Sequence, residues 1–145
     1  MLAITLKDNT RDLPTPYASL MEVGAKTIET RTWPVPMGWR HHFPLDLLIC
    51  ASKASKSPNA GLAVCVVTLY ECDVFKKEHL PDAYCDLYHG YAWKTHELRW
   101  LSQKFAVKGQ LGLFQIELPP GVTLYTPTVE QIVAAREQLL IDFPA

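Results

Sequence analysis

The sequence predicts an α+β domain in which a mainly antiparallel sheet of about six strands curls into a small barrel. Three observations support this prediction. About six segments have the apolar pattern of strands, helical patterns occur only near the start and at the end, and no repeat or linker divides the 145 residues. A chain of this length can bury a core, so we expect one domain over residues 1–145.

The first third of the chain predicts a strand, a helix and a second strand. The segment LAITL alternates apolar and less apolar residues, which is typical of a short strand. TPYASLMEVG predicts a short helix that is capped by Thr15, has Pro16 at its first position and ends at Gly24. We expect a strand over 26–32. The next segment, WPVPMGWRHHFP, predicts a loop because its prolines and glycine interrupt any ladder.

The middle of the chain contains the strongest strand signals. PLDLLICASK predicts a buried strand, SKASKSPNAG a flexible connection, and GLAVCVVTLYECDVF a strand long enough to need a bend or a bulge. PDAYCDLYHG is consistent with a short helix or a turn. YAWKTHELRWL and LGLFQIEL predict two further strands, with a turn at VKGQ between them.

The chain ends in a predicted amphipathic helix over residues 127–143, added to the common core. Its apolar stripe consists of Ile132, Ala135, Leu139 and Leu140. Thr128 and Gln131 have the spacing of a capping box.

Composition and charge exclude several classes of protein. The chain is 48% apolar and 20% charged, as in soluble globular proteins, and its net charge of -1 gives no wholly basic face for nucleic acid. No apolar run approaches the roughly 20 residues of a membrane span, and the start lacks the features of a signal peptide. We therefore expect a cytoplasmic protein without membrane contact. The four cysteines form no CxxC pair and are expected to be free, mostly buried thiols.

The segment VGAKTIETRTW gathers the most suggestive polar residues. Glu29, Arg31 and Trp33 share one face of an extended strand, whereas Lys26 has the opposite parity. The charges therefore converge only if Lys26 lies in the turn after Gly24 or if the strand twists. Two interpretations stay open on the residues alone. One is an exposed hairpin with a solvated ion pair, and the other is a nucleobase site with a ring for stacking, an arginine and a glutamate.

This segment also resembles a known family. GAKTIETR matches the GxKxxExR signature of ASCH domains, and TPYASLMEVG, LLICASK and GYAW…VKGQLGLF resemble further parts of that family in the same order. The resemblance covers about residues 2–118. It implies a PUA-like barrel, a cleft between barrel and helices, and a ligand that is single-stranded RNA or a nucleotide. The nucleic-acid-binding residues expected from it and from the residue types are Tyr17, Lys26, Arg31, Trp33, Ser52, Lys53, Lys108 and Gln110.

Several functions remain open at this level. The first is RNA binding without strong catalysis. The second is hydrolysis: magnesium-dependent cleavage of single-stranded RNA, with Lys53 as the cleft lysine, or deacylation of a nucleoside such as N4-acetylcytidine, with Lys26 and Glu29 as catalytic residues. In the deacylating branch of the family, a threonine stands where this chain has Glu29. The third is a protein-interaction module that uses the final helix. We expect no metal held by His41 and His42, because adjacent strand-like residues point in opposite directions. The sequence does not predict an oligomeric state.

Overall fold

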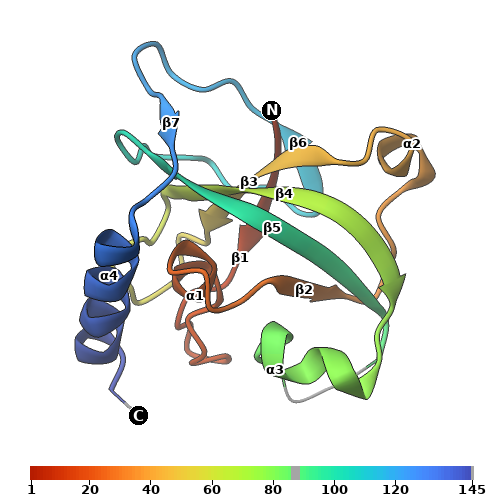
Figure 1. The fold of residues 1–145 in the computed structure, drawn as a ribbon, viewed down its shortest axis with the longest axis horizontal. Helices are drawn as coiled ribbons and strands as arrows, with labels where there is room; N and C mark the ends of the chain where they lie inside the picture. Colours follow the sequence, from red (N-terminus) through yellow and green to blue (C-terminus); the bar gives the residue numbers. More distant parts are fainter. Residues whose placement is uncertain (86–88, 145) are drawn as a thin grey trace.

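The computed structural model describes residues 1–85 and 89–144. Its strands belong to one curled, mixed sheet with the order β2-β5-β4-β3-β1-β6, and β7 pairs with β5 (Figure 1). The strands are β1 Leu2–Leu6, β2 Ile28–Arg31, β3 Leu45–Ala51, β4 Ala63–Val74, β5 Tyr91–Leu101, β6 Leu113–Gln115 and β7 Leu124–Tyr125. The helices are α1 Tyr17–Glu22, α2 Met37–Arg40, η1 Lys77–His79, α3 Leu80–Ala83 and α4 Val129–Asp142.

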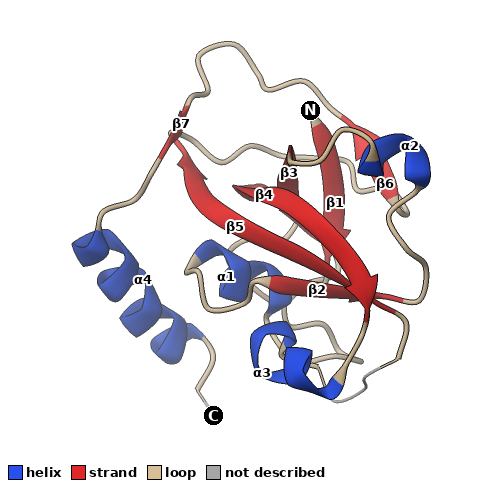
Figure 2. Ribbon diagram, turned by 45° about the vertical axis from the view of Figure 1, so that its right-hand side comes forward, coloured by secondary structure: helices blue, strands red, loops and turns tan. Residues whose placement is uncertain are grey.

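The sheet confirms the predicted α+β class. All of its pairings are antiparallel except the parallel pairing of β1 with β3. The register of β4 against β5 shifts between Val66 and Thr68 and again between Leu69 and Glu71, so the long strand has the expected irregularities. Such bulges increase local bending and twist. In Figures 1 and 2, β4 and β5 curve over α1, α3 and β2.

The central strands are buried on both faces, which explains their continuous apolar runs. One core cluster includes Ile4, Leu47, Leu69 and the fully buried Trp93. The other face carries a second cluster, with Leu48, Cys50, Val66 and Phe114. The four cysteines are free, as predicted; Cys50 and Cys65 are buried, whereas Cys72 and Cys85 are half-buried.

The structure corrects several predicted boundaries. The N-cap of α1 is Pro16, and Thr15 provides no side-chain cap; the carboxylate of Asp8 accepts the N–H of Ser19 instead. The predicted loop at 33–44 contains α2, which begins after Pro36. β6 is shorter than the segment LGLFQIEL, and β7 was not predicted. Only the start of PDAYCDLYHG is helical, in α3, and its residues 86–88 lie outside the described part.

The final helix has the predicted start, and its packing face agrees with the predicted stripe except at Leu140. The capping box of Thr128 and Gln131 is present. Ile132, Ala135 and Leu139 are half-buried, whereas Leu140 is 71% exposed, so its place in the packing stripe was wrong. α4 lies outside α1 (Figure 2), where Arg136 Nε donates to the carbonyl oxygen of Val23 at 3.0 Å. Within the described residues, no helix has the length and apolar character needed to cross a membrane.

Candidate functional site

A cleft of about 1210 Å³ lies where the sheet is open, between the edge strand β2, the end of β1 and the segment 106–112. The loop after β3 and the start of α1 complete its walls. Tyr17, Lys26, Glu29, Arg31, Ser52, Lys53, Lys108 and Gln110 all line this cleft. The fold therefore brings together eight of the nine residues that the sequence marked as binding or catalytic.

Lys26 forms part of the cleft floor. It precedes β2 and so lies in the turn rather than in the strand, which removes the parity conflict noted from the sequence. Its side chain is 1% exposed, and Nζ lies 3.3 Å from Glu29 Oε1. Nζ also donates to the carbonyl oxygens of Ile28 and Ala83 at 2.5 and 2.6 Å. The ammonium lies 5.3 Å from the centre of the Tyr17 ring, a cation–π distance.

These contacts limit what Lys26 can do. Burial lowers the pKa of the Lys26 ammonium below its ordinary value of 10.5, and the neighbouring Glu29 carboxylate opposes this shift. An ammonium has three donors, and three oxygen atoms surround this one. Lys26 therefore holds β2, α3 and Glu29 together, and proton transfer at Nζ would require some of these bonds to break.

Glu29 and Arg31 connect the two sides of the opening. Arg31 Nε and Nη2 each lie 2.9 Å from Glu29 Oε2. Nη2 also donates to the carbonyl oxygen of Thr5 in β1 at 3.1 Å, so the guanidinium spans from β2 to β1. A guanidinium carries five N–H donors. Among the described residues, none accepts from Nη1, so this edge of Arg31 can bind a ligand in the cleft.

The cleft has a strong excess of positive charge. Five of its described lining residues are Lys or Arg, and one is a carboxylate, although the whole chain has a net charge of -1. Lys7, Lys53 and Lys108 have no ion-pair partner in the described part of the chain. Clefts lined by one sign of charge focus the electrostatic potential and attract ligands of the opposite sign. The site therefore favours an anion.

Apolar side chains also line the cleft. Leu13, Tyr17, Leu62, Val107 and Leu111 all border the cleft. Leu111 is 100% exposed and Leu13 is 41% exposed, so both offer their side chains to a ligand. A ligand that suits this surface combines an anionic group with a flat or apolar body.

Trp33 is the predicted site residue that the fold places elsewhere. It is not among the lining residues; it packs against Trp93 with the ring centres 4.9 Å apart and nearly perpendicular. Its carbonyl oxygen accepts from Trp93 Nε1. Trp33 therefore lies beside the cleft, with its ring next to Gly112, and Tyr17 is the aromatic residue among the described lining residues.

Sequence reasoning missed other lining residues, including Thr5, Lys7 and Leu13. Lys7 follows β1 directly, and this position at a strand end next to a loop was the available signal. The described residues contain no group of three or more His, Cys, Asp or Glu that could hold a metal ion.

The chain was compared with family models, curated proteins and solved structures. No family model matches the chain, and no curated protein matches it. Among solved structures, the chain is similar to the crystal structure of ASCH from Zymomonas mobilis, with 11% identity and a TM-score of 0.48 over 95% of this chain and 94% of that one. That protein carries the name of the family that the sequence motifs resemble. The sheet and helices described above are of the α+β class that the sequence predicts.

Proposed function

We propose that the cleft binds single-stranded RNA, or a nucleotide-sized piece of it, through phosphate groups at its lysines and a base among its apolar side chains. The observation that supports this proposal best is the excess of cations in the cleft of a chain with a net charge of -1. Phosphate oxygens are good partners for the free edge of Arg31 and for unpaired lysines. A base can lie against Tyr17 and the neighbouring leucines.

The size of the cleft agrees with this ligand. Its volume of about 1210 Å³ is above the 300–1,000 Å³ that is typical of small-molecule pockets. The exposed lining residues Lys53 and Leu111 form a rim of the cleft, so a bound strand can continue past them into solvent. Lys53 is exposed on the loop at this rim, which suits a contact with a phosphate of the bound strand.

Salt dependence tests the proposal. Each phosphate contact on a single strand contributes about 0.7 to the slope of log affinity against log salt concentration. Fluorescence anisotropy of a labelled single-stranded oligouridylate should show that Lys53→Ala weakens binding and lowers this slope by about 0.7. Lys77→Ala makes the same charge change at an exposed lysine outside the cleft lining and should behave as the unchanged protein. Equal effects of the two substitutions would refute the cleft as the binding site.

Cleavage of single-stranded RNA is a second proposal, supported by one specific observation. The ribonuclease branch of the ASCH family, which this chain resembles in size, uses a tyrosine, a lysine and a serine. The sequence matched only Lys53 to that lysine, and Tyr17 and Ser52 line the same cleft here. The described residues do not fit a magnesium ion held by the protein. Glu29, the one carboxylate among the described lining residues, is engaged by Lys26 and Arg31. We therefore assign no step to the metal.

Labelled RNA incubated with and without magnesium tests this second proposal. Cleavage should be retained by Lys77→Ala and lost in Lys53→Ala. Activity that persists in Lys53→Ala, or that separates from the protein on further purification, would dismiss it. Deacylation of a nucleoside has weaker support, because three oxygen atoms hold Lys26 Nζ and two cations hold Glu29. If the protein releases acetate from N4-acetylcytidine and Lys26→Ala abolishes this activity, deacylation becomes better supported than RNA cleavage.

A further inference from the structure

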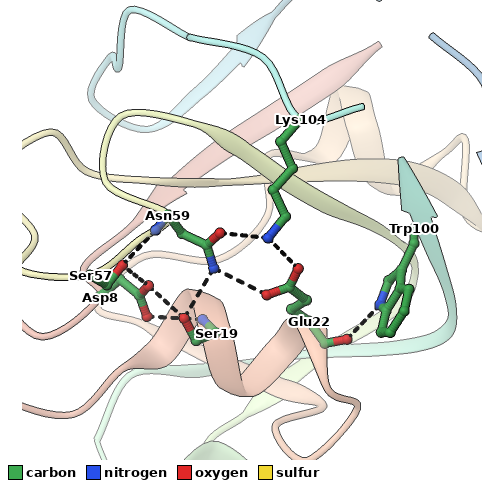
Figure 3. Close-up of polar contacts among 7 residues, drawn as sticks. All are labelled: Asp8, Ser19, Glu22, Ser57, Asn59, Trp100 and Lys104. Carbon is green, nitrogen blue, oxygen red and sulfur yellow. Dashed lines mark hydrogen bonds and ion pairs between the residues drawn. The ribbon is translucent and has the colours of Figure 1, made fainter. Parts of the chain in front are cut away.

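A buried polar network lies behind the loop that carries Lys53, and its centre is Asp8 (Figure 3). Asp8 is fully buried. Its Oδ1 accepts the N–H of Ser19 at 2.9 Å, and its Oδ2 accepts the hydroxyls of Ser19 and Ser57 at 2.6 and 2.5 Å. The carboxylate therefore joins the segment after β1 to helix α1 and to the loop over 52–61.

Asp8 also contacts this loop through its main chain. Its N–H donates to Ser55 Oγ at 3.0 Å, and Ser55 Oγ lies 2.8 Å from Ser52 Oγ. Ser52 and Lys53 are neighbours in the sequence, and both line the cleft. A short chain of hydrogen bonds thus leads from a buried carboxylate residue to the cationic rim of the site.

The far end of the loop is anchored by the same network. Asn59 Nδ2 donates to Ser19 Oγ and to Glu22 Oε1, each at 3.1 Å. Lys104 Nζ donates to Asn59 Oδ1 at 2.6 Å and pairs with Glu22 Oε2 at 2.5 Å (Figure 3). The network holds three positions of the loop, Ser55, Ser57 and Asn59. The loop residues on either side of them, 52–54 and 60–62, line the cleft.

Burial of the Asp8 carboxylate has a free-energy cost, because the charge loses its hydration. Among the described residues, no lysine or arginine pairs with Asp8, so hydroxyl and amide donors alone compensate for the burial of its charge. Buried charges contribute less to stability than their contacts suggest, because desolvation opposes the gain. Fully bonded buried networks do fix one geometry. Asp8 therefore has a clearer effect on where the loop lies than on how stable the core is.

We propose that Asp8 is a positioning residue that fixes the loop over 52–61 and so holds Lys53 and Ser52 in place for an anionic ligand. This inference depends on the proposed function of the cleft. Electrostatics alone predicts the opposite effect. Removing a negative charge near an anion site strengthens anion binding, whereas loss of positioning weakens it. The sign of the change in affinity thus separates the two explanations.

The test uses four variants of the whole chain. Asp8→Ala removes all three acceptor contacts. Ser57→Ala removes the contact of the loop with the carboxylate and leaves those of Ser19; it also removes the bond from the Asn59 N–H to Ser57 Oγ, so exchange is compared at loop amides other than Asn59. Asp8→Asn retains an acceptor for the Ser19 N–H and gains an amide that can donate to the serine hydroxyls. Asp12→Ala is the matched control, because it removes one carboxylate from an exposed position on the same segment.

Two readouts are needed, amide hydrogen exchange over 52–61 and affinity for the labelled oligouridylate. Hydrogen bonds to charged groups are worth about 1.5–3 kcal/mol. Asp8→Ala and Ser57→Ala should therefore accelerate exchange in the loop by at least about tenfold. Both should weaken RNA binding, with partial recovery in Asp8→Asn. Asp12→Ala should leave exchange unchanged and bind as tightly or more tightly. If Asp8→Ala does not fold, Ser57→Ala still tests whether the network positions the loop, because it leaves the contacts between Asp8 and Ser19 of α1 in place.

The inference is overturned if Asp8→Ala and Ser57→Ala bind RNA at least as tightly as Asp12→Ala. It is also overturned if exchange over 52–61 does not change, or changes without any loss of affinity. If the unchanged protein does not bind the oligouridylate, the proposed function fails. The exchange data then decide alone whether Asp8 fixes the loop, so the two failures are distinguishable.

Discussion

Replacement of Glu29 by glutamine gives the sharpest test of how the cleft floor is held. The substitution retains the size of the side chain and removes its charge, which leaves the ammonium of Lys26 buried without a carboxylate. Another glutamate provides a matched comparison. Glu29 Oε1 lies 3.3 Å from Lys26 Nζ, and Glu71 Oε1 lies 3.3 Å from Lys94 Nζ. The two pairs differ in burial, and Glu29 has Arg31 as a second partner, whereas Glu71 has Lys94 alone among the described residues.

The expected magnitudes follow from that difference. The side chains of Lys26 and Glu29 are 1% and 11% exposed, whereas those of Lys94 and Glu71 are 21% and 49% exposed. Removing one partner of a buried pair costs about 3–5 kcal/mol, and an exposed pair contributes about 0–1 kcal/mol. For a chain of this size, 1 kcal/mol corresponds to about 2–4 °C in Tm. Glu29→Gln should lower Tm by about 6–20 °C, and Glu71→Gln by less than about 4 °C.

Chemical denaturation and thermal unfolding at neutral pH measure both variants against the unchanged protein. Added salt should reduce the small effect of Glu71→Gln and leave most of the effect of Glu29→Gln, because buried pairs are screened less. If the two substitutions cost the same within about 1 kcal/mol, the reasoning that Glu29 compensates for the buried charge of Lys26 is wrong.

Two further predictions concern other parts of the chain. Thr128→Ala removes the cap of α4 and should cost about 1 kcal/mol, which accelerates amide exchange over 129–142 about fivefold. Global unfolding should not change, since α4 has no buried residue; an equal loss of global stability would contradict this. Burial raises the pKa of the Cys50 thiol from 9.0 to about 12. Its contribution to stability is therefore present below pH 9 and lost as pH rises toward 12, because only the unfolded chain ionises readily. Unfolding free energies measured across this range should fall less steeply in Cys50→Ala, and an unaltered slope would rule out this explanation.

Much of the fold could be predicted because its patterns are local. Alternation and apolar runs located six of the seven strands, and the Thr128–Gln131 spacing located the start of the last helix. Leu140 was placed wrongly because an amphipathic pattern gives a stripe but not the width of the surface that covers it. β7 has two residues, too few for any period to appear.

The site could be predicted in part. Parity showed that Lys26 reaches Glu29 only if it lies in the turn or if the strand twists, and the structure places Lys26 before the start of β2. An aromatic residue beside charges suits a binding surface and a core equally well, so the sequence alone could not show that Trp33 packs against Trp93 beside the cleft. The buried position of Asp8 had no sequence signal, since its donors come from α1 and from a loop about 50 residues away.

Chemical-shift mapping of backbone amides during titration with a single-stranded oligouridylate tests the central claim most directly. If the cleft is the RNA site, the largest shifts should fall on the lining segments of β1, β2, the loop 52–54 and residues 106–112. α4 presents the exposed apolar residues Val129, Val133, Leu140 and Ile141, which form an alternative surface. Shifts confined to α4, or no saturable shifts in the cleft at low salt, would contradict the proposed function.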